Sequence, residues 1–249
     1  MEDQSWQRAR IVKAVHGLKE PTVDPEYVSG LAGYLRSQYD RNGLIELYGR
    51  FVAGEGAFDT LMRQVIWKAL ARRMGDGVTI GAGVRFKHIE TFEIGNDVFI
   101  GAGSYLQGRF DGVCVIGDRV WIGPQSYFDA RHLTIAEDVG WGPGAKVLGS
   151  THTGLPLDLP ILRTDLIIAP VHVEAWADIG TGAILLPGVT VGKASIVGAG
   201  AVVTRDVPPF AVVAGVPARF LHSRQEPGTE RGSESTQDAG NPNRNDGED

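Results

Sequence analysis

Cysteine is almost absent from the chain, which has 249 residues and one cysteine, Cys114. A single thiol cannot form a disulfide within the chain, and this excludes a disulfide-stapled secreted scaffold. A chain so poor in cysteine fits the reducing cytoplasm best, so we expect a cytoplasmic location. Cys114 falls on a face of the repeat described below, which predicts a packing role for its side chain.

Long hydrophobic runs and excess positive charge are also missing. No stretch of about 18 apolar residues occurs, so no membrane-spanning helix is predicted. The opening residues, MEDQSWQRARIVKAVHG, lack the apolar segment of a signal peptide. The net charge of −6 at pH 7 argues against nucleic acid as a main partner, because phosphate binding favours a basic surface. We therefore expect a globular protein with neither nucleic acid nor integral membrane association.

Glycine, in contrast, is abundant, with 34 residues, and large aliphatic residues recur six apart between the glycine-rich turns. A helix would place apolar residues 3.6 apart, and a hairpin sheet would alternate them in twos. A spacing of six fits a coil of three flat faces, each one hexapeptide long, with the aliphatic side chain pointing inward. Residues 76–221 thus predict a parallel β-helix of about six coils. The cleanest run is Val173, Ile179, Leu185, Val191, Val197 and Val203.

The segments on either side of the repeat have a different character. Residues 1–75 predict helices, the clearest being GAFDTLMRQVIWKALARRMG, with Arg72 and Arg73 in its last turn and an apolar stripe. We expect these helices to pack on the repeat or on a neighbouring subunit; the alternative is that their basic end touches a membrane surface or a polymer substrate. Residues 222–249 contain few apolar residues and predict a disordered polar tail.

One segment interrupts the repeat, GSTHTGLPLDLPILRTDL at residues 149–166. A loop of this length in a compact domain is usually functional. A histidine, His152, lies where the interruption starts. We expect it at the root of the loop, where the rigid coil would hold its backbone in place. The alternative is an exposed loop histidine without a role.

Two stretches of the chain carry a family resemblance. IGTGAILLPGVTVGKASIVGAGAVVTRDVPPFAVVAGVPARFL and YFDARHLTIAEDVGWGPGAKVLGSTHTG resemble the hexapeptide-repeat acyltransferases, including the maltose and galactoside O-acetyltransferases and the sugar O-acetyltransferases of surface-polysaccharide clusters. The resemblance covers residues 76–221. It implies a mainly β fold, a left-handed parallel β-helix, in a homotrimer with active sites between adjacent β-helices. It also implies acetyl-CoA as co-substrate, a sugar or glycan acceptor and no metal.

Acetyl transfer from a thioester to a hydroxyl needs a base near neutral pH, and histidine suits this role. His152 matches the family's base, and no covalent enzyme intermediate is required. Asp129 matches an acidic position that would orient the base, although a repeat corner also favours aspartate for backbone reasons. Asp158 and Asp165 are alternatives for that role, and either could instead bind sugar hydroxyls.

The same resemblance assigns residues to coenzyme A. Thr204 and Arg205 match positions that approach the ribose 3′-phosphate, and Arg219 matches a basic residue near the nucleotide. Thr181 and Ala199 match backbone contacts to the pantetheine and the oxyanion. For the two arginines, a solvated surface charge is the alternative.

Departures from the family leave the acceptor open. Pro124 replaces an asparagine of the maltose-type enzymes, and Asp178 replaces a tryptophan found in many relatives. An N-acetyltransferase acting on an amino sugar or nucleotide sugar is the close alternative. Two other classes share the fold. One is a metal-dependent lyase like the γ-carbonic anhydrases, with zinc held by three histidines across a subunit interface; His132, His152 and His172 lie 20 residues apart, but the close histidine pair of such sites does not occur in the sequence. The other is a non-catalytic trimeric scaffold.

Overall fold

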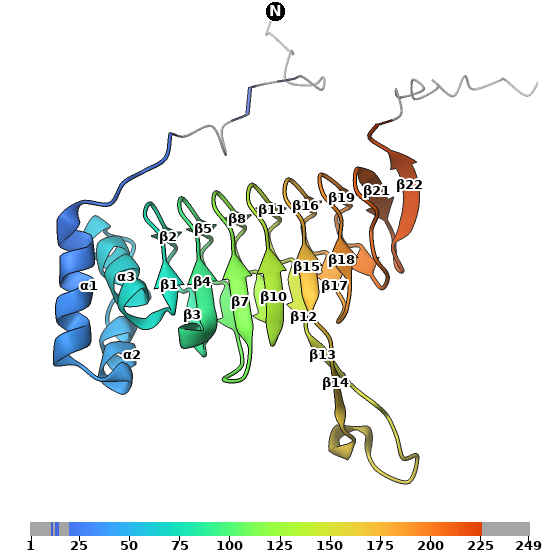
Figure 1. The fold of residues 1–249 in the computed structure, drawn as a ribbon, viewed down its shortest axis with the longest axis horizontal. Helices are drawn as coiled ribbons and strands as arrows, with labels where there is room; N and C mark the ends of the chain where they lie inside the picture. Colours follow the sequence, from blue (N-terminus) through green and yellow to red (C-terminus); the bar gives the residue numbers. More distant parts are fainter. Residues whose placement is uncertain (1–10, 12, 15–19, 226–249) are drawn as a thin grey trace, which may run out of the picture.

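The computed structural model describes residues 11, 13–14 and 20–225. Helices at one end are followed by a long stack of short strands, so the body is elongated (Figure 1). The helices are α1 (Glu26–Gln38), α2 (Arg41–Gly49) and α3 (Ala57–Leu70).

Most of the strands pair in parallel in three sheets, which are the three faces of a coil. The chain visits sheets A, B and C in turn, so it makes six complete coils before β21 starts another. The parallel β-helix predicted from the six-residue spacing is confirmed.

Sheet A consists of β1 (Arg73–Met74), β4 (Phe92–Ile94), β7 (Val113–Ile116), β10 (His132–Ile135), β15 (Val171–Val173) and β18 (Thr190–Val191). Sheet B consists of β2 (Thr79–Ile80), β5 (Phe99–Ile100), β8 (Trp121–Ile122), β11 (Gly140–Trp141), β16 (Asp178–Ile179), β19 (Ile196–Val197), β21 (Ala211–Ala214) and β22 (Arg219–Ser223). Sheet C consists of β3 (Arg85–Lys87), β6 (Tyr105–Gln107), β9 (Tyr127–Asp129), β12 (Lys146–Leu148), β17 (Ile184–Leu185) and β20 (Val202–Val203).

The hexapeptide positions explain why the coil closes. The aliphatic residues at six-residue spacing point into the coil and are buried, with Ile179, Leu185 and Val197 fully inaccessible. Burial of one such side chain contributes about 1.5–3 kcal/mol. Corners of successive coils stack so closely that a Cβ on Gly142 would lie 2.5 Å from the amide nitrogen of Thr181, so only glycine fits there.

The helices cover the first coil. Trp67 of α3 is fully buried and meets the ring of Phe86 edge-on at 5.3 Å between centroids. The Arg63 guanidinium donates from Nε to the Ile80 carbonyl of β2, 2.9 Å away. An open solenoid end would expose its core and unpaired strand edges. The expected packing of the helices on the repeat is therefore what the structure has, at its N-terminal end.

The boundaries differ slightly from those expected. The prediction that Arg72 and Arg73 close a helix is wrong, because α3 ends at Leu70 and Arg73 opens β1, three residues before residue 76. Both arginines instead pair with Glu93, at 3.5 and 3.4 Å. A continuing helix would have carried these side chains away from the second coil.

The other end of the repeat is closed by β22, which runs antiparallel to β21. This strand reaches Ser223, two residues into the segment expected to be a disordered tail. Residues 226–249 of that expected tail lie outside the described residues.

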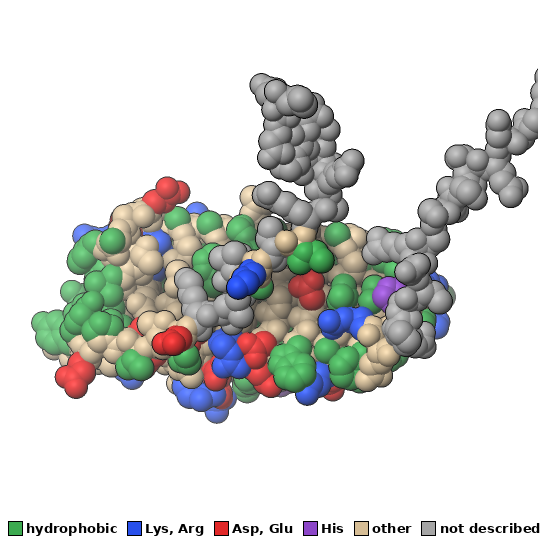
Figure 2. Space-filling view, turned by 90° about the horizontal axis from the view of Figure 1, so that it is seen from above, with side chains coloured by type: hydrophobic (Ala, Val, Ile, Leu, Met, Phe, Trp, Pro, Cys, Tyr) green, Lys and Arg blue, Asp and Glu red, His purple; other side chains and the backbone are tan. Residues whose placement is uncertain are grey.

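The surface of the coils is mixed in character. From above, acidic, basic and hydrophobic side chains are interspersed (Figure 2). In the described part of the chain, no helix has the length and apolar character needed to cross a membrane.

Candidate functional site

The interruption of the repeat is an antiparallel hairpin, β13 (Ser150–His152) and β14 (Leu166–Ile168), which projects away from the coils (Figure 1). It leaves the coil between β12 of sheet C and β15 of sheet A. At its root the Ala169 amide donates to the Gly149 carbonyl, 3.1 Å away. A short 3₁₀ turn, η3 (Ile161–Arg163), lies in the excursion between the two strands. The segment is thus built on paired backbone, which suits the positioning of a side chain.

Thr164 organises the hairpin around His152. The Thr164 side chain is 6% exposed; its hydroxyl donates to the Ile161 carbonyl at 2.7 Å and accepts from the Gly154 amide at 3.2 Å. Its carbonyl lies 3.0 Å from His152 Nδ1. A carbonyl only accepts, so Nδ1 carries the proton, and in the neutral ring Nε2 is left as an acceptor. This is the tautomer that a general base needs.

A cavity of about 280 Å³ lies at the root of the hairpin. Residues directly opposite in an antiparallel pair point to the same side. His152, opposite Leu166, therefore shares one side of the hairpin with Ser150 and Ile168. Ser150, Leu166 and Ile168 line the cavity, so His152 lies on the side of the hairpin that faces the cavity. The lining residues are Lys87, His88, Arg109, Phe110, Asp129, Arg131, Ser150, Leu166 and Ile168.

The cavity exists because every irregularity of the repeat falls at the same corner, between sheets C and A. The turn η2 (Ile89–Thr91) follows β3, residues 108–112 follow β6, residues 130–131 follow β9, and the hairpin follows β12. Stacked coils bring these insertions into one column. Our sequence reasoning missed Lys87, Arg109, Phe110 and Arg131; the available signal was that the breaks in the six-residue spacing recur about once per coil.

Asp129 lines this cavity, but within one chain it is engaged elsewhere. Its Oδ1 accepts from Gln107 Nε2 at 2.8 Å and from Arg109 Nη2 at 2.6 Å. Among the described residues no hydrogen bond joins it to His152, whose ring is held by the Thr164 carbonyl instead. Asp158 and Asp165 are exposed on the hairpin and do not line the cavity.

The residues expected to contact coenzyme A occupy two corners of the coil. Thr181 and Ala199 lie at the corner between sheets B and C, on successive coils, where the Gly200 amide donates to the Thr181 carbonyl. Arg219, on β22, pairs with Ala214 near that corner. The amides of Thr181 and Ala199 make no hydrogen bond within residues 20–225, and each nitrogen packs against the glycine of the preceding coil, Gly142 and Gly180.

Thr204 and Arg205 lie at the other corner, between sheets C and A, on the same edge as the hairpin. Both are exposed. The structure thus does not bring the whole expected set together in one chain.

Cys114 is buried and fills the inner face of β7. Burial raises the pKa of its thiol to about 12, against a small opposing effect of a backbone hydrogen bond from Leu133. A thiol with such a pKa is protonated near neutral pH and is a poor nucleophile. The packing role expected for this residue agrees with its place in the structure.

Histidines on the sheet A face do not assemble into a metal site. His132 and His172 are exposed on β10 and β15, whereas His152 is on the hairpin. Within the described part of the chain there is no group of three or more His, Cys, Asp or Glu residues that could hold a metal ion. Within one chain, His132, His152 and His172 therefore do not come together.

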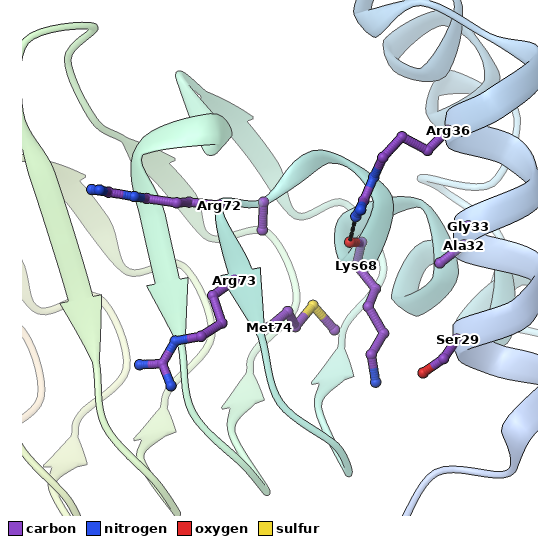
Figure 3. A pocket seen from close by; sticks show the side chains of 9 residues that line it. Ser29, Ala32, Gly33, Arg36, Lys68, Arg72, Arg73 and Met74 are labelled. Carbon is purple, nitrogen blue, oxygen red and sulfur yellow. Dashed lines mark hydrogen bonds between the residues drawn. The ribbon is translucent and has the colours of Figure 1, made fainter.

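A second hollow, of about 260 Å³, lies between the helices and the first coil (Figure 3). Its cations already have partners: Arg36 donates to the Lys68 and Ala69 carbonyls at the end of α3, and Lys68 Nζ pairs with Asp24 and Asp76 at 3.0 and 2.6 Å. We interpret this hollow as part of the packing between helices and coil.

Comparison with known proteins agrees with the fold. The family model described as "Hexapeptide repeat of succinyl-transferase" matches residues 170–205, which are the cleanest run of the repeat. A protein of Schizosaccharomyces pombe assigned as an acetyltransferase is 38% identical over 95 residues, covering 38% of this chain and 44% of the relative. The repeat of this chain is thus similar to that of hexapeptide-repeat acetyltransferases.

Two further relatives of this hexapeptide-repeat chain are informative. Galactoside O-acetyltransferase of Escherichia coli is 30% identical over 125 residues, covering 43% of this chain and 62% of that protein. The chain therefore spans about half the length of these curated relatives. A structure of a variant of AntD, an N-acyltransferase from Bacillus cereus in complex with dTDP and coenzyme A, has a TM-score of 0.57 at 20% identity and covers 64% of this chain and 86% of that one. At this identity it shows the shared fold.

Proposed function

We propose that the chain is a CoA-dependent O-acetyltransferase acting on a hydroxyl of a sugar or glycan, with His152 as the general base. The observation that carries this proposal is the ring geometry: Nδ1 is held by the Thr164 carbonyl, 3.0 Å away, and Nε2 is left to accept a proton. The names of the relatives support the reaction class, since one is a galactoside O-acetyltransferase and another was crystallised with coenzyme A.

Acetyl-CoA supplies the acetyl group as a thioester. His152 Nε2 removes the proton of the attacking hydroxyl as the new C–O bond forms, and the resulting imidazolium returns that proton to the departing sulfur. The ester and free CoA are the products, so His152 ends as it began. On the resemblance, the backbone of Thr181 and Ala199 would contact the pantetheine and the oxyanion.

We further propose that the complete site forms between copies of the chain in a homotrimer. His152 and Thr204 lie on one edge of the coil and Thr181 on another, so a neighbouring copy is needed to bring the two edges together. The hairpin has the apolar surface for such a contact: it exposes Leu155, Leu157, Leu159, Ile161, Leu162, Leu166 and Ile167 by 43–88%. Exposed apolar patches of this kind mark interaction surfaces. In such an assembly Arg205 and Arg219 would face the nucleotide. The cytoplasmic location stays a prediction.

The hairpin contact can be tested with Leu157→Ser combined with Leu162→Ser. We expect this variant to sediment as a smaller species and to lose acetyl transfer, because both side chains are more than 80% exposed in the single chain. Tyr27→Ser, which removes a 60% exposed side chain from α1, is the control and should leave the assembly unchanged. A doubly substituted protein that still sediments as a trimer would contradict the proposed contact.

The reaction itself is tested by release of free CoA from acetyl-CoA in the presence of sugars, amino sugars, nucleotide sugars and small alcohols. We expect a sugar to accelerate thiol release and to gain one acetyl group by mass. Mild alkali removes an O-acetyl ester but leaves an N-acetyl amide, which separates our proposal from the N-acetyltransferase alternative. Thiol release that no acceptor accelerates would count against both.

A further inference from the structure

We propose that the cavity at the root of the hairpin is a subsite for an anionic group of the acceptor, so that the acceptor is a sugar bearing a phosphate or a carboxylate. This inference rests on the proposed function, since it names the substrate class for the same site. It is carried by the charge, shape and position of the cavity.

Positive charge dominates the cavity. Its lining includes Lys87, Arg109 and Arg131, against a single carboxylate, Asp129. Asp129 is paired with Arg109 at 2.6 Å, which leaves the other two cations without a carboxylate inside the cavity.

The two remaining cations differ in their partners. Arg131 Nε pairs with Asp111 Oδ1 at 2.9 Å, without the geometry of a hydrogen bond. Lys87 has no ion pair within the described residues, and its side chain is exposed. An anion in the cavity would give Lys87 a partner of opposite charge and Arg131 a second one.

An aromatic ring completes the lining. Phe110 is 78% exposed although it is apolar, and its ring lies 6.3 Å from that of His88. Such a ring offers a flat apolar surface against which the C–H face of a sugar can pack. Guanidinium and ammonium groups beside it are suited to an oxyanion, because Arg binds both phosphate and carboxylate in a bidentate manner.

Size and position select a small acceptor close to the base. A volume of about 280 Å³ is near the lower end of the ~300–1,000 Å³ typical of small-molecule pockets. This suits one sugar ring with its anionic group. Because Ser150, Leu166 and Ile168 line the cavity from the side of the hairpin that carries His152, a sugar anchored there presents its hydroxyls toward the base.

Binding is tested by titration calorimetry with glucose, glucose 6-phosphate and glucuronate as neutral, phosphate and carboxylate probes. We expect one or both anionic sugars to bind at least tenfold more tightly than glucose, and inorganic phosphate to compete with them. Lys87→Gln and Arg131→Gln should each weaken that binding at least tenfold, and added salt should weaken it as well. Lys87 is exposed, so its variant keeps the test valid even if the Arg131 variant does not fold.

The matched control is Arg50→Gln, which removes an exposed positive charge at the end of α2, away from the cavity. It should leave sugar binding unchanged. Equal binding of glucose and the anionic sugars, or binding that is unaffected by Lys87→Gln, would overturn the inference.

Turnover measurements separate this inference from the proposed function. If Lys87→Gln raises KM for an anionic acceptor and leaves KM for acetyl-CoA unchanged, both stand. Acetylation of neutral sugars by the natural protein with the same kcat/KM as anionic sugars would refute the anionic subsite and leave the transferase. Tight binding of an anionic sugar without any acetyl transfer would leave the subsite and refute the transferase.

Discussion

Replacing His152 with alanine is expected to lower kcat for acetyl transfer by about 10²–10⁴-fold, the range in which a general base contributes. In the proposed mechanism, the His152 ring is the group that removes the proton from the attacking hydroxyl. Its Nδ1 is already bonded to the Thr164 carbonyl, so Nε2 has no competing task in the hairpin. The measurement is steady-state release of free CoA with the best acceptor found.

The variant should lose little stability, because His152 is part-buried on the projecting hairpin and outside the coil. An unchanged melting temperature and sedimentation profile would establish that the loss is chemical. His132→Ala and His172→Ala are matched controls on the exposed face of sheet A, and both should retain activity. If His132→Ala and His172→Ala abolish activity as fully as His152→Ala, a shared histidine site becomes the better explanation and the base assignment fails.

The parallel β-helix could be predicted because each of its faces is determined by the residues of one hexapeptide. One large aliphatic residue in six and a permissive corner residue decide each face without reference to distant parts of the chain, and inward positions such as Ile179 and Leu185 are accordingly buried. The residue types accepted at the corners are more varied than the sequence pattern suggests, since Gln125, Trp176 and Ala194 also adopt positive φ. The stacking of the neighbouring coils holds them there.

The candidate site was less predictable because it depends on how insertions stack. The hairpin and His152 could be located from the broken spacing, but the partner of Asp129 could not. Its neighbours, Gln107 and Arg109, come from the previous coil, and only the register of β6 against β9 brings Gln107 beside it. A residue count cannot give this register where coils differ in length. The Thr164 carbonyl that holds His152 is a backbone group and carries no side-chain signal at all.

The largest effect on stability is expected at Arg63, which joins the helical cap to the first coil. Its side chain is 2% exposed, and its guanidinium donates to the carbonyls of Ile80, Phe51 and Gly54. Alanine would leave the buried Ile80 carbonyl without its donor, which is unfavourable by about 1–3 kcal/mol, and would remove the donor of the part-buried carbonyls of Phe51 and Gly54. We expect Arg63→Ala to lower the free energy of unfolding by at least ~3 kcal/mol.

For a chain of this length such a loss corresponds to a melting temperature about 6–12 °C lower, measurable by circular dichroism or calorimetry. Arg63→Lys should fall between alanine and the natural residue, because one ammonium group cannot reach carbonyls from β2 and from the α2–α3 connection in the same geometry. Arg50→Ala, at an exposed position, should shift stability by no more than about 0.5 kcal/mol. If Arg63→Ala and Arg50→Ala have the same melting temperature, the cap is held by the packing of Trp67 and its neighbours alone.

Loss of the cap would also expose the edges of β1, β2 and β3. The Arg63→Ala variant should therefore aggregate on heating at concentrations at which the Arg50→Ala variant stays dispersed.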